Sequence, residues 1–412
     1  MPQRSADLTS IDLFAGCGGL SLGLEQAGFR TLAFSELNRD AADTYAHNRS
    51  HQRIARFGPV QELQDGATVR RLLRDFEKQG VRRIDLVCGG PPCQGYSGIG
   101  HRRSYSVERR EIPSNHLYLD MIDVIRRFRP RMFLFENVRG LMTGRWTAEG
   151  SPGEIWRDVL HAFENVGDYE VRFALVQAKQ YGVPQNRPRI LLVGVHKDVR
   201  WTADGSARAI AEGLLPRPTG NAPNLVDVLG DLIDPEYLSK AETDHYPSPA
   251  TTAFQREVRR VGVKVLGKGS PLTEHFYSKH SARVRAKFEA MHRSGGTIPE
   301  SMRTKKFAQR LLKPEWGDEG PTITATSLPD DFVHFAQPRS LTVREWARLQ
   351  CFPDWYQFNG PRTTGGVRRA GNPSEGIWDR EVPKYTQIGN AVPVRLANAV
   401  GKHLASILRS AK

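Results

Sequence analysis

The sequence of 412 residues contains 39% hydrophobic and 25% charged residues, which is the composition of a folded globular protein. No apolar run approaches the roughly 20 residues that span a bilayer, and the N-terminal stretch MPQRSADLTS lacks the apolar core of a signal peptide. These features exclude disordered, fibrous and membrane-spanning proteins, and we expect a cytoplasmic protein. The four cysteines are too few for a disulfide framework, so we predict free thiols.

The formal net charge of +14 is concentrated in one segment. Residues 256–313 hold 15 Lys and Arg against 4 Asp and Glu, a surplus of 11 positive charges. Such a concentration favours a polyanionic partner that docks there, although a solvated basic face is the plainer interpretation. The length allows two domains, because single cores stop growing near about 250 to 300 residues.

The first 200 residues alternate short apolar runs with helical patterns. Helical stripes run through Leu20, Leu24 and Ala27, and from Leu117 to Phe128. This alternation predicts βαβ units and a mostly parallel sheet with helices on both faces, an α/β fold. The predicted strands are Ser10 to Phe14, Thr31 to Glu36, Ile84 to Val87, Arg131 to Glu136, Glu170 to Gln177 and Arg189 to Val195.

The pattern changes after the last predicted strand. Residues 201–330 are rich in Gly, Pro, Ser, Lys and Arg with weak periodicity, which indicates a smaller, irregular domain. Helical signals return after Ser340 and after Val394. We therefore predict a first domain over 1–200, an inserted domain over 201–330, and a C-terminal segment over 331–412 that returns to the first domain.

The stretch IDLFAGCGGL, residues 11–20, predicts a strand, a glycine-rich turn and the start of a helix. Small residues let the backbone approach a ligand, and the helix N-terminus offers free N–H groups. Glu36 ends the next predicted strand, where a carboxylate can accept hydrogen bonds from ribose hydroxyls. A nucleotide-like cofactor is one interpretation and a plain tight turn is another, because Ser21 breaks the full GxGxxG spacing.

The stretch VCGGPPCQGYS, residues 87–97, places a thiol, Cys93, after two glycines and two prolines. Most lone cysteines are small buried hydrophobes. A thiol on a stiff loop beyond a parallel strand, however, lies at the edge where α/β sheets bind ligands, so a nucleophile is the sharper hypothesis. Zinc is disfavoured, because only Cys88 lies close in the sequence and no further ligands complete a site.

Two further motifs end or begin predicted strands. Glu136, in MFLFENV, should reach the same edge as Cys93, where burial would raise the pKa of its carboxyl; a strand-end Glu facing water is the alternative. Arg187 and Arg189, in QNRPRI, are two residues apart and could face one side, suited to an anionic or carbonyl-bearing substrate.

Seven motifs of the chain, in this order, resemble the DNA cytosine-5 methyltransferase family: DLFAGCGGL, SELN, GGPPCQGYS, FENV, QNRPR, LTVREWARLQCFPD and QIGNAVP. The resemblance covers nearly the whole chain outside 201–320. The resemblance implies a Rossmann-like catalytic domain that uses S-adenosyl-L-methionine, with a target-recognition domain inserted before the C-terminal helices. It also implies double-stranded DNA as partner. We expect a monomer that modifies DNA beside a cognate restriction endonuclease in the bacterial cytosol.

In the mechanism that the resemblance implies, the Cys93 thiolate adds to C6 of a flipped-out cytosine, Glu136 supports protonation at N3, and C5 then accepts the methyl group. Arg189 would contact the base, with Arg187 and Asn137 ordering the site. The resemblance assigns Gln94 and Ser97 to a moving loop that enters the space left by the base, and the basic Arg102 and Arg103 in the loop after Cys93 could bind DNA phosphates. The cofactor residues it implies are Phe14, Gly16, Gly18, Leu20, Glu36, Leu37, Pro91, Asn115 and Asn390.

The chain departs from the family pattern at Pro59, where an adenine-contacting Asp is usual; Asp65 is too far along to replace it. Cys351 stands where the family often has glycine. Two other hypotheses stay open. The first is a tRNA cytosine-5 methyltransferase, and the residues Gly95, Tyr96 and Ser97 after PPCQ argue against it. The second is a catalytically silent DNA-binding protein, and the joint presence of Cys93, Glu136 and Arg189 argues against it.

Overall fold

The computed structural model describes residues 8–92, 113–201, 213–303, 309–315, 320–324, 331–364 and 381–411. Five residues predicted to act in catalysis or DNA binding therefore lie outside the described residues: Cys93, Gln94, Ser97, Arg102 and Arg103. Among the described residues, no helix combines the length and the apolar character needed to cross a membrane.

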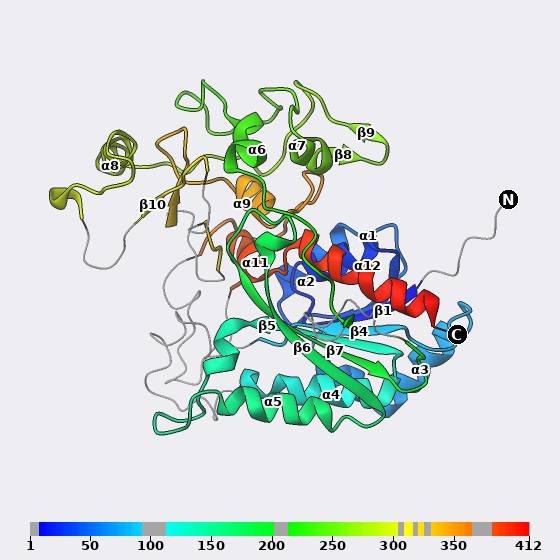
Figure 1. Cartoon of the computed structure of the whole chain (residues 1–412). Coiled ribbons are helices and arrows are strands. Elements are labelled where there is room, and N and C mark those ends of the chain that lie inside the picture. Colours follow the sequence, from blue (N-terminus) through cyan, green and yellow to red (C-terminus); the bar gives the residue numbers. More distant parts are fainter. Residues whose placement is uncertain are drawn as a thin grey trace.

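A seven-stranded sheet forms the centre of the molecule, in the order β3-β2-β1-β4-β5-β7-β6 (Figure 1). Strands β1 to β5 run parallel, and β7 pairs antiparallel with both β5 and β6. The strands of this sheet are β1 (Leu8–Leu13), β2 (Phe29–Ser35), β3 (Ala55–Phe57), β4 (Leu86–Gly89), β5 (Met132–Val138), β6 (Tyr169–Gln177) and β7 (Pro188–His196). The predicted α/β fold class is confirmed, and β3 is the strand that the sequence pattern missed.

Helices cover both faces of the sheet, as Figure 1 shows. One face buries apolar side chains of α3, α4 and α5, and the other those of α1 and α12. The helices are α1 (Gly19–Gln26), α2 (Arg39–His47), α3 (Gly66–Glu77), α4 (Leu117–Phe128), α5 (Glu154–Glu164), α6 (Leu225–Leu229), α7 (Ala253–Val258), α8 (Ala282–Arg293), α9 (Val343–Leu349), α11 (Lys384–Asn390) and α12 (Val394–Ser410).

The C-terminal helix α12 packs along α1, next to the first strands of the chain. Gly23 makes this close approach possible, because a Cβ there would lie 2.4 Å from the Ala397 Cβ. The last part of the chain thus completes the core that the first part begins. The three described cysteines outside the Cys93 loop are buried free thiols, as predicted: Cys17, Cys88 and Cys351.

Residues 213–303 hold short helices and little sheet, with β8 (Arg260–Val261) and β9 (Lys264–Val265) as a two-stranded hairpin. A second small pair joins β10 (Arg310–Leu311) to β11 (Phe332–Val333). Leu225, Val228 and Leu229 of α6 nevertheless belong to the same apolar cluster as Trp346 of α9. This part of the chain is therefore anchored by packing on the C-terminal segment.

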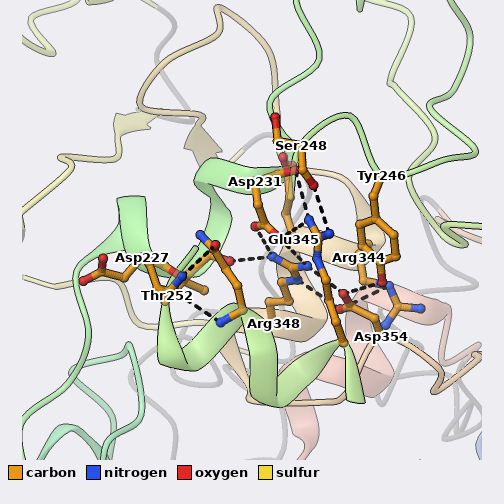
Figure 2. Close-up of polar contacts among 12 residues, drawn as sticks. Asp227, Asp231, Tyr246, Ser248, Thr252, Arg344, Glu345, Arg348 and Asp354 are labelled. Carbon is orange, nitrogen blue, oxygen red and sulfur yellow. Dashed lines mark hydrogen bonds and ion pairs between the residues drawn. The ribbon is translucent and has the colours of Figure 1, made fainter. Parts of the chain in front are cut away.

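A buried group of charges surrounds α9, which we call the arginine cluster, and Figure 2 shows most of it. It consists of Asp231, Arg259, Arg339, Glu345, Arg348 and Asp354. Arg348 binds Asp231 at 2.5 Å and Asp354 at 2.6 Å, and Arg259 also pairs with Asp231. Arg339 contacts Glu345 with two nitrogens, at 2.6 and 2.8 Å. The polar residues of α9 are therefore structural, and they join α6 to the C-terminal segment.

Candidate active site

The predicted site residues on β1 to β5 converge because these strands are parallel, so their carboxyl ends share one edge of the sheet. The glycine loop follows β1, Glu36 follows β2, and the turn with Pro91 follows β4. Glu136 lies near the end of β5, and the antiparallel β7 begins at this same edge, where Arg189 pairs with Val138. The parallel strands and the antiparallel β7 thus gather motifs that lie up to 175 residues apart in the sequence.

The glycine loop, residues 14–18, has three residues in left-handed backbone conformation: Phe14, Gly16 and Gly18, with φ of 56°, 57° and 85°. Such φ values favour glycine, so the non-glycine Phe14 is strained. Phe14 is half-buried against the core beside the sheet. The loop therefore turns sharply out of the strand and leads into α1.

Glu36 fixes this loop to the next strand. Its two carboxylate oxygens accept hydrogen bonds from Gly16 N and Asn38 N, each at 2.8 Å. Burial raises the pKa of the Glu36 carboxyl, although the hydrogen bonds from the two backbone N–H groups act to lower it. A Cβ built on Gly16 meets nothing within 4 Å, so the loop has an open side beside the carboxylate. An acceptor beside an open glycine face suits the ribose of a nucleotide-like cofactor.

Residues beneath the loop were missed by the sequence interpretation. Asp12, inside β1, accepts a hydrogen bond from the Ser21 hydroxyl at 2.5 Å, and the Tyr45 hydroxyl donates to Ser21 Oγ at 2.8 Å. Burial raises the pKa of Asp12 to about 7, although the hydrogen bond from Ser21 and the charge of Arg49 act to lower it. The one hint of these buried hydrogen bonds in the sequence is an acidic residue, Asp12, within the apolar run TSIDLF.

Glu136 and Arg189 form a buried ion pair, with Arg189 Nε 2.6 Å from Glu136 Oε1. Burial raises the pKa of the Glu136 carboxyl, while Arg189 and then Arg187 act to lower it. Gly90 lies directly against this carboxyl, because a Cβ at Gly90 would be 2.8 Å from Glu136 Oε2. The glycine of the GGPP motif therefore allows the turn to approach Glu136, and water-facing exposure of this Glu is excluded.

The neighbouring predicted residues hold backbone segments together. Asn137 Nδ2 donates to the Pro91 carbonyl at 3.1 Å, which ties β5 to the turn after β4. Arg187 is buried and donates to the carbonyls of Gly389 at 2.6 Å and of Ile323. Burial and the nearby Arg189 lower the pKa of Arg187 well below its usual range. Both side chains order the edge of the sheet.

The other predicted cofactor residues have varied surroundings. Leu20 is packed in the core, whereas Leu37 is 74% exposed beside Glu36. Asn115 is buried just before α4, and Asn390 is exposed at the end of α11, next to the Gly389 that Arg187 binds. Contacts of these residues with a cofactor stay predictions. Asp65 caps α3 by accepting from Thr68 N at 2.7 Å, which gives it a local structural role.

The fold and the sheet edge describe an α/β enzyme whose site joins a glycine loop to a buried Glu–Arg pair. The family model of C-5 cytosine-specific DNA methylases matches residues 8–406. The chain belongs to this family, and it is a DNA cytosine-5 methyltransferase.

Two curated relatives match over most of their length. The Type II methyltransferase M.XorII of Xanthomonas oryzae is 32% identical, over 97% of this chain and 85% of the relative. The Type II methyltransferase M.DdeI of Desulfomicrobium norvegicum is 29% identical, over 96% of this chain and 88% of the relative. Both matches span nearly the whole chain.

A solved structure from E. coli, assigned as a prophage-encoded DNA modification methyltransferase, superposes with a TM-score of 0.69. It is 23% identical and covers 98% of this chain and 100% of its own. At this identity the likeness concerns the fold, and it agrees with the mostly parallel sheet described above.

Proposed function

We propose that this enzyme transfers a methyl group from S-adenosyl-L-methionine to C5 of a flipped-out cytosine in a specific duplex DNA sequence. The observation that carries the proposal is the buried Glu136–Arg189 pair beneath the Gly90 turn, on the same sheet edge as the glycine loop and Glu36. The described chain reaches Pro92, and the proposed nucleophile Cys93 is the next residue in the sequence.

Glu136 supplies the proton relay in this proposal. Burial raises the pKa of the Glu136 carboxyl, which favours its protonated form, and this proton would be shared with N3 of the cytosine, which makes C6 electrophilic enough for the Cys93 thiolate. The thiolate would add to C6 while N3 takes the proton, and C5 would then take the methyl group, which leaves S-adenosyl-L-homocysteine. Loss of the C5 proton to water, elimination of the Cys93 thiolate and return of the N3 proton to Glu136 would release 5-methylcytosine. Arg189 holds Glu136 in place and faces the base.

The residues around the glycine loop fit the proposed cofactor. The Glu36 carboxylate, fixed by two backbone N–H groups, is suited to accept ribose hydroxyls, and the open face of Gly16 leaves room for the ligand. When bound, S-adenosyl-L-methionine supplies an electrophilic methyl group. Phe14, Leu37, Pro91, Asn115 and Asn390 are proposed to line the remainder of this pocket.

We propose that residues 201–330 recognise the DNA target and that 1–200 and 331–412 form the catalytic part. Most described basic side chains of 256–313 are exposed, as phosphate binding requires, whereas Arg259 and Lys287 are buried. Phosphate contacts by this segment, and by Arg102 and Arg103, would offset the few kcal/mol that base flipping costs. Gln94 and Ser97 would enter the space that the base leaves.

The similarity to M.XorII and M.DdeI, both named Type II methyltransferases, supports a place in a restriction-modification system. The methyl group would then protect the host sequence from a cognate restriction endonuclease. We propose that the enzyme acts on DNA as a monomer in the bacterial cytosol.

The proposal is tested by transfer of tritiated methyl groups from S-adenosyl-L-methionine to duplex DNA and to tRNA in parallel. We expect label in duplex DNA alone, recovered as 5-methylcytosine after digestion, and none with Cys93→Ser. Label in tRNA but not in DNA would replace the proposed substrate class, and label in adenine would contradict the reaction.

A further inference from the structure

A buried arginine lies beneath the glycine loop, outside every motif assigned so far. Arg49 follows α2 and is 3% exposed. Its Nε donates to Glu25 Oε1 at 2.7 Å, and its Nη2 donates to the carbonyl of Gly18 at 3.2 Å. The guanidinium also lies 4.0 Å from the centre of the Tyr45 ring. Arg49 is thereby fixed in one orientation, with one nitrogen on the loop.

A tyrosine from the C-terminal segment holds the adjacent carbonyl. The Tyr356 hydroxyl donates to the Cys17 carbonyl at 2.5 Å and accepts from Arg49 Nη1 at 3.0 Å. Tyr356 is fully buried, and its ring packs against Phe352 and Phe358 at centroid distances of 4.9 and 5.6 Å. Two consecutive carbonyls of the loop are thus held by one hydrogen-bonded pair.

The fit around Gly18 shows how closely the loop sits on this pair. A Cβ at Gly18 would lie 2.7 Å from Arg49 Nη1 and 2.9 Å from the Tyr356 hydroxyl. Because peptide units are planar, holding the Cys17 and Gly18 carbonyls also fixes the peptide planes that enter α1. The carbonyls face the protein interior, and Gly16 keeps its open side beside Glu36.

We propose that Arg49 and Tyr356 are positioning residues for cofactor binding, acting through the carbonyls of Cys17 and Gly18. This inference rests on the proposed function, because it assumes that S-adenosyl-L-methionine binds along the glycine loop. Neither side chain touches the reacting atoms in this account. Their effect is to hold the loop in its binding geometry before the cofactor arrives, which lowers the cost of ordering it on binding.

The experiment compares Tyr356→Phe with Tyr181→Phe. Both tyrosines are buried, and each hydroxyl donates to a backbone carbonyl, that of Cys17 at 2.5 Å and that of Pro216 at 2.8 Å. Each substitution removes this donated hydrogen bond and keeps the ring, and Tyr356→Phe also removes the oxygen that accepts from Arg49 Nη1. Arg49→Lys is the second test variant, because it retains the charge but cannot reach several partners in fixed directions.

The first readout is the Kd of S-adenosylhomocysteine for the full chain without DNA, measured by titration calorimetry. We expect Tyr356→Phe to raise this Kd about 5-fold and Arg49→Lys about 10-fold or more, because the first loses the two hydrogen bonds of the hydroxyl and the second weakens several. The KM for S-adenosyl-L-methionine should rise in parallel, while kcat at saturating cofactor and the duplex DNA affinity change less than about 2-fold. Tyr181→Phe should lower the Tm about as much as Tyr356→Phe does, but it should leave the Kd unchanged.

Two results are decisive in the other direction. An unchanged Kd in Tyr356→Phe, with wild-type protein that binds the ligand, reduces the pair to a structural network and overturns this inference alone. Failure of the wild-type protein to bind S-adenosylhomocysteine at all overturns the proposed cofactor, and this inference with it. Equal weakening by Tyr181→Phe would also count against a positioning role, because that hydroxyl lies away from the loop.

Discussion

The sheet edge and the arginine cluster are both buried and charged, but the pKa values of their carboxyl groups are shifted in opposite directions. At the sheet edge, burial raises the pKa of Glu36 and Glu136, and that of Asp12 to about 7. In the arginine cluster burial acts in the same direction, yet the pKa of Asp354 and of Glu345 lies below its usual range.

The number of facing arginine contacts explains this difference. Glu345 receives two nitrogens of Arg339, and Asp354 receives two nitrogens of Arg348. Asp12, by contrast, is bonded to a hydroxyl and a thiol, from Ser21 and Cys88. Glu136 contacts Arg189 through Nε at 2.6 Å. Burial with a bidentate arginine lowers the pKa of a carboxyl, whereas burial with neutral donors, or with one arginine nitrogen, leaves its pKa raised.

The largest effect is expected for Glu136→Gln, which removes the titratable group of the sheet edge. Because proton transfer to the base would be lost, kcat should fall by roughly 10²- to 10⁴-fold. Duplex DNA affinity should change only a few-fold, since Glu136 is buried away from the phosphates. Glu170→Gln on β6, which removes the carboxylate that pairs with Arg172 at 2.8 Å, is the matched control. Equal losses of turnover and DNA binding in Glu136→Gln would contradict the proton-relay role.

In the arginine cluster the large effect should be on stability. Arg348→Met leaves Asp231 and Asp354 buried without this partner, which costs about 3 to 5 kcal/mol in free energy of unfolding, measured with denaturant. The exposed pair of Arg127 and Asp123 on α4 is the comparison, and Arg127→Ala should cost about 0 to 1 kcal/mol. Equal costs for the two variants would show that burial of the cluster is unimportant.

A pH titration separates the two regions further. The pKa of Asp12 is raised from 3.8 to about 7 on folding, which corresponds to about 4 kcal/mol. Its contribution to stability is complete below the unfolded pKa and is lost as the pH rises through about 7. Relative to wild type, Asp12→Asn should therefore become more stable as the pH rises from about 4 to 7. If the free energies of unfolding of the two proteins differ by the same amount throughout this pH range, the raised pKa of Asp12 is refuted.

The opposite slope should come from Glu345, with a smaller effect. Arginine contact lowers its pKa, so its contribution is present above the unfolded pKa of 4.5 and is lost as the pH falls through the folded value. Glu345→Gln retains one acceptor for Arg339 and should cost about 1 to 3 kcal/mol at neutral pH. The two proteins should converge in stability as the solution is acidified, and a constant difference down to low pH would disagree with this account.

The sequence predicted the parts of the site that depend on strand order. Glu36 and Glu136 follow or end strands with strong apolar patterns, so their meeting at one edge followed from parallel topology. Arg189 begins a strand, and it reaches the same edge because β7 runs antiparallel to β5, which the sequence pattern did not predict. The strand β3 was missed because it has three residues and an exposed Arg56 in its middle.

The supports beneath the site could not be predicted in the same way. Arg49 and Tyr356 meet across 307 residues, and no periodic pattern records a contact between two polar side chains so far apart. The sequence did single out Cys351, where the family often has glycine, and the structure supplies the reason. Cys351 has φ of 62°, a left-handed conformation in which glycine is favoured.

The most direct measurement is covalent trapping of the enzyme on duplex DNA that carries 5-fluorocytosine at the target base, with S-adenosyl-L-methionine present. Fluorine in place of the C5 proton blocks elimination of the thiol, so the account predicts a denaturation-resistant adduct that disappears in Cys93→Ser. An adduct that persists in that variant, or none with the wild-type enzyme on DNA that it methylates, would contradict the central role of this thiol.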